Sequence, residues 1–298
     1  MSNIHQLSLI SGPGSGSGDS CHLVTRSGRS AAIQFGDWEL AYGSVQGREH
    51  ARVGKNNQDA VVLLQDPHHL VGIVSDGCGS SAHSEVGAQL GSWICAQVIH
   101  QQLQSGDLCW PRLKSSLLQS LRDLGRLMQG SPGHLLQDYL LFTLVGVILT
   151  AETGVVFNVG DGVVILNGEV KLSGSCESNS PDYLAYGLLQ DDRSPLEILV
   201  DLPIQEVETL LIGTDGVADL MRVSDHNLPG KKERVGPISQ FWQEDRYFQN
   251  PDQIRRYLNL INREVLRPNW STQTLQRQGG LLPDDTTLMV LKRRTDSL

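Results

Sequence analysis

Three apolar runs in the sequence end in the same dipeptide, Asp-Gly. The runs LVGIVS, VVFNVG and TLLIGT are followed by Asp76-Gly77, Asp161-Gly162 and Asp215-Gly216. Two further apolar runs begin beside acids, with Asp59 before AVVLL and Asp284-Asp285 before TTLMVL. An aspartate at the end of a buried strand is held on rigid backbone with its oxygens at the rim of the sheet. The glycine beside it allows a sharp turn or a close approach to an ion.

Acids gathered at one rim would repel each other and take up protons unless a cation lay between them. Hard divalent cations such as Mg²⁺ and Mn²⁺ accept such oxygen ligands, and a pair of them activates water and clamps phosphoryl oxygens. The pattern therefore predicts a site with two or three Mg²⁺ or Mn²⁺ ions that hydrolyses a phosphate ester. A single Asp-Gly is more often a turn, so the prediction depends on five acidic positions beside apolar runs.

Hydrophobic periodicity predicts the elements that position these acids. Residues with strand character occupy 38–45, 60–64, 70–76, 140–150, 154–161, 162–172, 209–216 and 286–292, with Asn167-Gly168 as a hairpin turn. Helical spacing predicts helices over 84–103, from Pro111 to Gly130, and over 251–265. Because the strands come in runs with the helices grouped between them, we expect an α+β architecture with antiparallel sheets.

Length and composition predict one folded domain with an appended arm. The chain has 298 residues, of which 39% are hydrophobic and 19% are charged, so it can bury a large core. The Gly/Ser-rich stretch 11–20 predicts that residues 1–35 form a flexible arm and that residues 36–298 form the single domain. Residues 173–203 contain Pro181, Pro195 and Pro203, which predicts a mobile loop or flap.

Charge and apolar content exclude several classes of partner. The net charge of −9 disfavours nucleic acid, which needs a basic face. No apolar run reaches the roughly 20 residues that a membrane span requires, and the N-terminus lacks the pattern of a secretory signal. Five scattered cysteines without a C-x-x-C pair indicate neither a disulfide framework nor a zinc site. We expect a soluble, cytoplasmic protein without membrane or nucleic-acid partners, with a monomer favoured.

Five segments together resemble the type 2C family of metal-dependent serine/threonine protein phosphatases, particularly its bacterial members. In the order of the family they are GREHARVGKNNQDA (47–60), SDGCGSSAHSEVGA (75–88), VGDG (159–162), GTDGVADLM (213–221) and PDDTTLMV (283–290). The resemblance implies an αββα sandwich of two central antiparallel β-sheets flanked by helices, with the metal site in a cleft at one edge. It also implies hydrolysis of phosphoserine and phosphothreonine in a phosphorylated protein substrate, such as a kinase-regulated signalling protein.

The resemblance also implies roles for the acids. Asp76 would bridge two core ions beside the carbonyl of Gly77, while Asp215 and Asp284 complete the second ion. Asp161 and Asp215 would form a weaker third-metal site. Asp59 matches the acid that orients the attacking water. Two further implications are that Asp285 supports the site from outside the ligand set and that 173–203 is the variable flap that meets substrates.

Three positions depart from the family pattern. Gln58 stands where the family often has Glu, Cys78 stands where eukaryotic members often have a histidine proposed as general acid, and the phosphate-binding arginine does not align. The candidates for that phosphate contact are Arg48, His50, Arg52 and Lys55. Arg48 and Arg52 suit it best, because a guanidinium binds phosphate with two hydrogen bonds. The departures leave open a weakly active or inactive relative that serves as a phosphoprotein-binding regulatory module.

Overall fold

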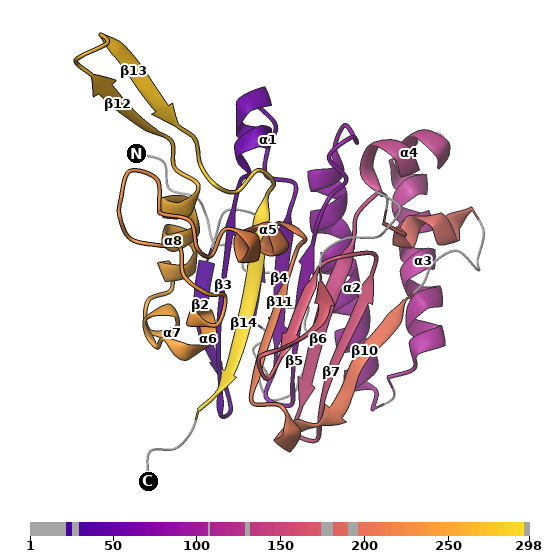
Figure 1. Cartoon of the computed structure of the whole chain (residues 1–298). Coiled ribbons are helices and arrows are strands. Elements are labelled where there is room, and N and C mark those ends of the chain that lie inside the picture. The colour runs from indigo at the N-terminus through magenta and orange to yellow at the C-terminus, as the bar shows by residue number, and fades with distance from the viewer. Residues whose placement is uncertain are drawn as a thin grey trace, which may run out of the picture.

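A computed structural model describes residues 22–25, 30–106, 108–128, 132–173, 181–189 and 196–294. Two six-stranded sheets, in which all strand pairs are antiparallel, pack face to face and carry helices on their outer sides (Figure 1). The predicted αββα sandwich is therefore confirmed. Among the described residues, no helix combines the length and the apolar character needed to cross a membrane.

The first sheet has the strand order β1-β4-β5-β6-β7-β10. Its strands are β1 (His22–Thr25), β4 (Ala60–Gln65), β5 (His69–Ser75), β6 (Leu144–Thr150), β7 (Thr153–Val159) and β10 (Glu197–Pro203). The second sheet has the order β2-β3-β14-β11-β8-β9. Its strands are β2 (Ser30–Phe35), β3 (Trp38–Val45), β14 (Thr286–Arg293), β11 (Thr209–Gly213), β8 (Val163–Leu166) and β9 (Glu169–Ser173).

The helices flank the sandwich in two groups. On the outer side of the first sheet lie α2 (Ser84–Gln104), α3 (Trp110–Leu127) and α4 (Pro132–Tyr139). With the second sheet lie α5 (Gly216–Arg222), α6 (Gln240–Gln243), α7 (Arg246–Gln249) and α8 (Gln253–Ile261). Helix α1 (Arg48–Val53) stands at the end of the sandwich, and the 3₁₀ helices are η1 (Leu184–Leu188) and η3 (Ile204–Glu206). The helices predicted over 84–103 and from Pro111 are confirmed.

Strand β4 shows how the sequence divides the core into layers. Successive side chains of a strand point to opposite faces of its sheet. Ala60, Val62 and Leu64 accordingly pack in the cluster between the first sheet and α2 and α3. Val61 and Leu63 pack in the cluster between the two sheets. Since both faces of β4 are covered, its sequence is a continuous apolar run.

The described part of the predicted N-terminal arm belongs to the two sheets. Residues 30–35 form β2, which pairs with β3 from Phe35↔Trp38 to Ser30↔Gly43, and residues 22–25 pair with β4 as β1. Ala31, Ile33 and Phe35 alternate along β2 and pack, half-buried, against the core between the sheets. This alternation is short and follows a Gly/Ser-rich stretch, so it predicts a strand only weakly. Residues 1–21 lie outside the described residues.

The prediction that residues 173–203 form one mobile loop is wrong for its described parts. Residues 197–203 form β10, which pairs with β7 along its length and buries Val200. Leu184 and Ala185 of η1 are also buried, in the core beneath α3. Proline is tolerated at the ends of an edge strand, so the prolines at 195 and 203 flank or end β10 without preventing it. Residues 174–180 and 190–195 lie outside the described residues.

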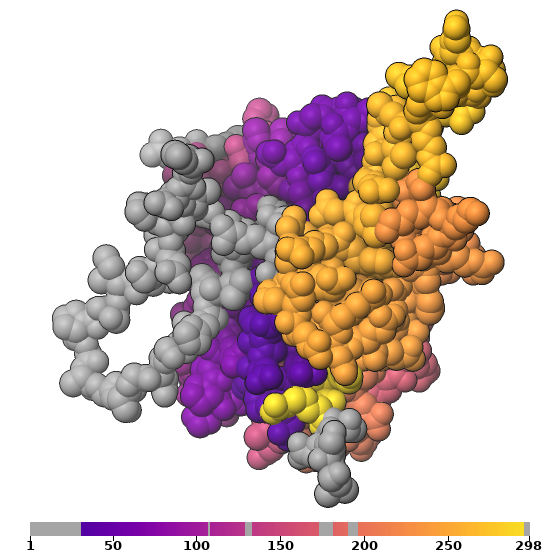
Figure 2. Space-filling model, turned by 90° about the vertical axis from the view of Figure 1, so that its left-hand side faces the viewer, coloured from indigo at the N-terminus to yellow at the C-terminus, as the bar shows by residue number. Residues whose placement is uncertain are grey.

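A hairpin of β12 (Val265–Asn269) and β13 (Thr274–Gln278) projects from the body of the molecule in two views (Figures 1 and 2). The predicted helix over 251–265 is therefore too long, because α8 ends at Ile261 and Val265 begins a strand. The hairpin exposes Leu266, Trp270 and Leu275 to solvent. Its strands pair only with each other, so neither is part of the sandwich.

Candidate active site

Antiparallel pairing places the strand-end acids at one end of each sheet. In the first sheet Ala60 pairs with Ser75, so the neighbouring residues Asp59 and Asp76 lie side by side at the end of the β4–β5 hairpin. In the second sheet β11 ends at Gly213 opposite Leu288 of β14, which brings Asp215 near the start of β14 and its preceding acids. The pairing thus assembles acids that are more than 200 positions apart in the chain.

One hydrogen bond joins the acid of the first sheet to the second sheet. Asp59 is fully buried, and the Thr214 hydroxyl donates to its Oδ2 over 2.9 Å. Thr214 is itself held by β14, because its Oγ1 accepts the backbone N–H of Thr287 over 3.1 Å. The other carboxylate oxygen of Asp59, Oδ1, is buried without a partner among the described residues. Asp59 therefore has a fixed orientation and one free acceptor.

The aspartates strongly perturb each other's ionisation. Burial, followed by the charge of Asp285, raises the pKa of Asp59 well above its ordinary value. Burial, followed by the charges of Asp59, Asp215 and Asp284, does the same to the pKa of Asp76. The pKa of Asp215 rises to about 7, mainly through burial and then through Asp284. Burial also raises the pKa values of Asp284 and of the remaining strand-end acid, Asp161. These carboxylates therefore cannot all remain ionised at neutral pH without a cation between them.

Asp285 and His50 lie beside this cluster and contact each other. Asp285 is buried and accepts two backbone N–H groups, that of Gly47 over 2.6 Å and that of Gln58 over 2.5 Å. The His50 Nδ1 atom lies 2.9 Å from Asp285 Oδ2 and 3.5 Å from Asp284 Oδ1. The Asp285 carboxylate raises the pKa of the His50 imidazole. Asp285 thereby ties α1, the start of β4 and the start of β14 together.

Two of the glycines are required by close backbone contacts. A Cβ atom on Gly77 would lie 2.8 Å from the carbonyl carbon and oxygen of Ser84, the first residue of α2. A Cβ atom on Gly216 would lie 2.0 Å from the carbonyl oxygen of Asp285. Glycine at these positions lets the helix starts of α2 and α5 pack directly against the loops that carry the acids.

Gln58 stands at the position where the family often has Glu. Its amide nitrogen makes a hydrogen bond to a neighbouring side chain. Its Nε2 donates to the Ser84 hydroxyl over 2.8 Å, and that hydroxyl donates to the Cys78 carbonyl over 2.9 Å. The Gln58 Oε1 atom is buried without a partner among the described residues. The amide therefore connects α2 to the Asp76 loop and retains one neutral oxygen acceptor.

The structure does not bring Arg48 or Arg52 into contact with the aspartates in the part of the chain that it describes. Both guanidinium groups pair with Glu49, and Arg48 also donates to the Gly280 carbonyl over 2.8 Å. They line a separate groove of about 580 Å³ on α1. Lys55 instead donates to the carbonyl of Gly79, in the loop that follows Asp76.

Sequence reasoning missed three contributors to the site. The tie between Thr214 and Asp59 has no signal in the sequence, because the two residues are 155 positions apart. The second is His50, a candidate for metal or phosphate contact in the sequence, which lies against the side chains of Asp284 and Asp285. The third is Asp219, whose charge contributes to raising the pKa of Asp215. Its position four residues after Asp215 at the start of α5 places it on the same helix face, which could have indicated its role.

The donor set fits a hard divalent cation. Two carboxylate oxygens, Asp59 Oδ1 and Asp215 Oδ1, are buried without a hydrogen-bond partner among the described residues. Carboxylate oxygens are the ligands that Mg²⁺ and Mn²⁺ prefer. Positive charge between the carboxylates would pair the buried oxygens and would also lower the raised pKa values. The aspartates of both sheets could therefore hold Mg²⁺ or Mn²⁺.

Comparison with known proteins agrees with this architecture. A model of the family described as Protein phosphatase 2C matches residues 46–258, and the chain belongs to this family. No curated protein sequence matches the chain. A serine-threonine phosphatase 2C from Toxoplasma gondii is similar in structure, with a TM-score of 0.51 and 10% identity, covering 91% of this chain and 99% of that chain. At this identity the likeness shows the fold.

Two bacterial structures are also similar. The serine/threonine phosphatase Stp1 from Staphylococcus aureus has 12% identity and a TM-score of 0.48, covering 86% of this chain and 95% of its own. PppA, described as a key regulatory component of T6SS in Pseudomonas aeruginosa, has 16% identity and a TM-score of 0.46, covering 89% of this chain and all of its own.

Proposed function

We propose that this protein hydrolyses phosphoserine and phosphothreonine monoesters in proteins, with Mg²⁺ or Mn²⁺ held by the aspartate cluster. The observation that carries the proposal is the convergence of Asp59, Asp76, Asp215 and Asp284, whose pKa values are all raised by burial and by neighbouring acids. Such repulsion costs folding free energy in the metal-free protein. A site that tolerates this cost is suited to cations rather than to a neutral ligand.

We assign Asp76, the Gly77 carbonyl beside it, Asp215 and Asp284 as the groups that would hold the two core ions. Asp161 and Asp215 would hold a third. When bound, two ions supply a nucleophile at neutral pH and neutralise the phosphoryl oxygens.

Asp59 is suited to orient the attacking water. Its Oδ2 is fixed by Thr214 and its Oδ1 is free to accept a hydrogen bond. We assign phosphate contact to Lys55, because it is held at the Gly79 carbonyl in the Asp76 loop. Arg48 and Arg52 would then contact the protein substrate beyond its phosphate, from the groove on α1. We also infer that the described residues from β1 onward act as one domain, since both sheets contribute to one core cluster between them.

Hydrolysis of p-nitrophenyl phosphate and of a phosphothreonine peptide, with and without Mn²⁺, tests this proposal. We expect Mn²⁺-dependent turnover by the wild type and a loss of about 10³-fold in Asp76→Ala and Asp215→Ala, equivalent to roughly 4 kcal/mol of transition-state stabilisation. Asp225→Ala is a matched control, because the Asp225 side chain is 88% exposed and pairs with Arg234.

Equal inactivity of the wild type and both variants in Mn²⁺ would refute the enzymatic proposal. Binding of the phosphothreonine peptide by such an inactive wild type would instead support the regulatory module that the departures at positions 58 and 78 leave open. Fluorescence anisotropy of the labelled peptide measures that binding directly.

A further inference from the structure

A second cluster of metal-ligating side chains lies at the far end of the β4–β5 hairpin. Asp66 lies in the turn between β4 and β5, His69 is the first residue of β5, and His100 comes from the last two turns of α2. One ligand atom from each of these three residues lies within 4.8 Å of the other two. All three side chains are buried. Strands of this length separate the cluster from Asp59 and Asp76 by roughly 20 Å.

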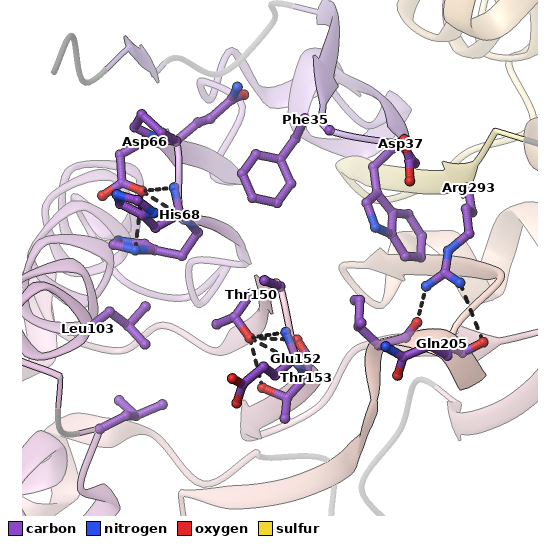
Figure 3. Close-up of a pocket in the computed structure, with 18 of the residues that line it drawn as sticks. Phe35, Asp37, Asp66, His68, Leu103, Thr150, Glu152, Thr153, Gln205 and Arg293 are labelled. Carbon is purple, nitrogen blue, oxygen red and sulfur yellow. Dashed lines mark hydrogen bonds and ion pairs between the residues drawn. The ribbon is translucent and has the colours of Figure 1, made fainter.

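The cluster borders an open groove of about 1030 Å³. Figure 3 shows Asp66 and His68 on one side of this groove and Asp37 and Arg293 across from them. His69 lines the same groove. A small ion and its water therefore have a path from solvent to the cluster.

A single chain of contacts runs through the two histidines. His100 Nε2 lies 3.0 Å from Gln104 Nε2, His100 Nδ1 lies 2.7 Å from His69 Nε2, and His69 Nδ1 lies 3.3 Å from Asp66 Oδ1. One proton assignment satisfies both hydrogen bonds: Gln104 donates to His100 Nε2, and His100 Nδ1 donates to His69 Nε2, which leaves the proton of His69 on Nδ1, near Asp66 Oδ1. Only one proton then separates the two imidazoles. Replacing that proton by a cation leaves the outer contacts in place.

Asp66 is oriented for a second acceptor role. Its Oδ1 accepts the backbone N–H groups of His68 and His69, each over 2.8 Å. Its Oδ2 accepts no hydrogen bond from any described residue and lies 3.9 Å from His100 Nδ1.

We propose that Asp66, His69 and His100 form a second metal site, selective for Zn²⁺ or a similar transition-metal ion, that clamps the β4–β5 turn to α2. The ligand atoms are Asp66 Oδ2, His69 Nε2 and His100 Nδ1, and binding releases the proton between the two rings to solvent. The fourth position faces the groove and takes water or the imidazole of His68. Two imidazoles and one carboxylate suit Zn²⁺, whereas the all-oxygen aspartate cluster suits Mg²⁺ or Mn²⁺.

A small movement of one ring completes the geometry. Ligand atoms around a tetrahedral Zn²⁺ are about 3.3 Å apart, given bonds of about 2.0 Å. The His100 Nδ1 atom is 2.7 Å from His69 Nε2 and 3.9 Å from Asp66 Oδ2. A displacement of His100 Nδ1 by about 1 Å, which takes it about 0.6 Å farther from His69 Nε2 and about 0.6 Å closer to Asp66 Oδ2, brings both separations near that value. The contact of His69 Nδ1 with Asp66 Oδ1 would meanwhile keep the ring oriented, as carboxylates commonly do for metal-bound histidines.

Cobalt absorption distinguishes this site from the aspartate cluster. Co²⁺ in a four-coordinate histidine site absorbs visible light far more strongly than six-coordinate, all-oxygen Co²⁺, so geometry is visible in the spectrum. Untagged protein is titrated with Co²⁺ in excess Mg²⁺, which occupies the aspartates. We expect one equivalent of strongly absorbing Co²⁺ per chain, proton release on binding, and loss of the band when Zn²⁺ is added.

Variants identify the ligands. His69→Gln and His100→Asn should each weaken Co²⁺ binding by at least about 100-fold. His226→Asn, which changes an exposed histidine, and Asp76→Ala, which changes the aspartate cluster, should both keep the band. Absence of an intense band in the wild type would overturn the proposal, whatever the folding of the variants. An unchanged band in both His69→Gln and His100→Asn would also overturn it.

Discussion

Asp284 and Asp285 are neighbours in sequence, and substituting each by asparagine should have opposite consequences. Asp285 is buried and accepts hydrogen bonds from the N–H groups of Gly47 and Gln58, one on each carboxylate oxygen. Asparagine has one oxygen, so Asp285→Asn directs an NH₂ group at one of those buried donors. Asp284 has a side chain that is 45% exposed, accepts the Asp285 N–H over 2.8 Å, and lies 3.5 Å from His50 Nδ1. An asparagine oxygen can accept that bond equally well.

The magnitudes follow from these contacts. Asp285→Asn loses one charge-assisted hydrogen bond, worth about 1.5–3 kcal/mol, and leaves a buried N–H unpaired at a further cost of about 1–3 kcal/mol. Relief of the repulsion with Asp59 offsets on the order of 1 kcal/mol. The net loss of about 1.5–5 kcal/mol lowers Tm by roughly 2–8 °C in a chain of this length. Asp284→Asn should change the free energy of unfolding by less than about 0.5 kcal/mol without metal.

The stabilisation gained from Mn²⁺ should differ between the two variants in the opposite sense. At 100 times its Kd, Mn²⁺ stabilises the wild type by about 2.7 kcal/mol, and a 100-fold weaker Kd reduces this to about 0.4 kcal/mol. We expect the larger value for Asp285→Asn and the smaller value for Asp284→Asn, since only Asp284 is assigned as a ligand. Thermal unfolding in EDTA and in Mn²⁺ measures both effects. If Asp284→Asn lost as much stability in EDTA as Asp285→Asn, or gained the full manganese stabilisation, the distinction between ligand and support would be incorrect.

Three further predictions concern the same end of the sandwich. The pKa of Asp215 is raised to about 7 from 3.8, so folding without metal takes up a proton at pH values between these two. The Tm measured in EDTA should therefore rise as the pH falls from 8 to 5. A Tm that stays constant or falls over this range would contradict the prediction. Gly77→Ala should lower the free energy of unfolding in urea by about 1–3 kcal/mol through overpacking. Gly133→Ala should not, because a Cβ atom there meets nothing within 4 Å. Equal losses in the two variants would refute the steric argument. Lys55→Ala should raise KM for p-nitrophenyl phosphate about 10-fold, and Arg52→Ala should raise it less than about 2-fold. A larger increase in Arg52→Ala than in Lys55→Ala would show that α1 contacts the phosphate.

The strands of the two sheet interiors could be predicted because their sequences are unambiguous. Runs such as AVVLL and TTLMVL are buried on both faces, and the acids that flank them are visible in the sequence. The edge elements could not be predicted in the same way. Strands β2 and β10 bury few side chains, so their segments resemble the polar stretches beside them until a neighbouring strand supplies the hydrogen bonds.

The sequence by itself determined which acids lie at strand ends and the order of the motifs that carry the family resemblance. Only the tertiary structure decided which of those acids are supports and which have free oxygens. Thr214 reaches Asp59 across 155 positions, and His100 reaches His69 across 31. Such contacts depend on strand register and on the packing of helices against sheets, which are set by the whole core. Local residue preferences carry no information about partners at that separation.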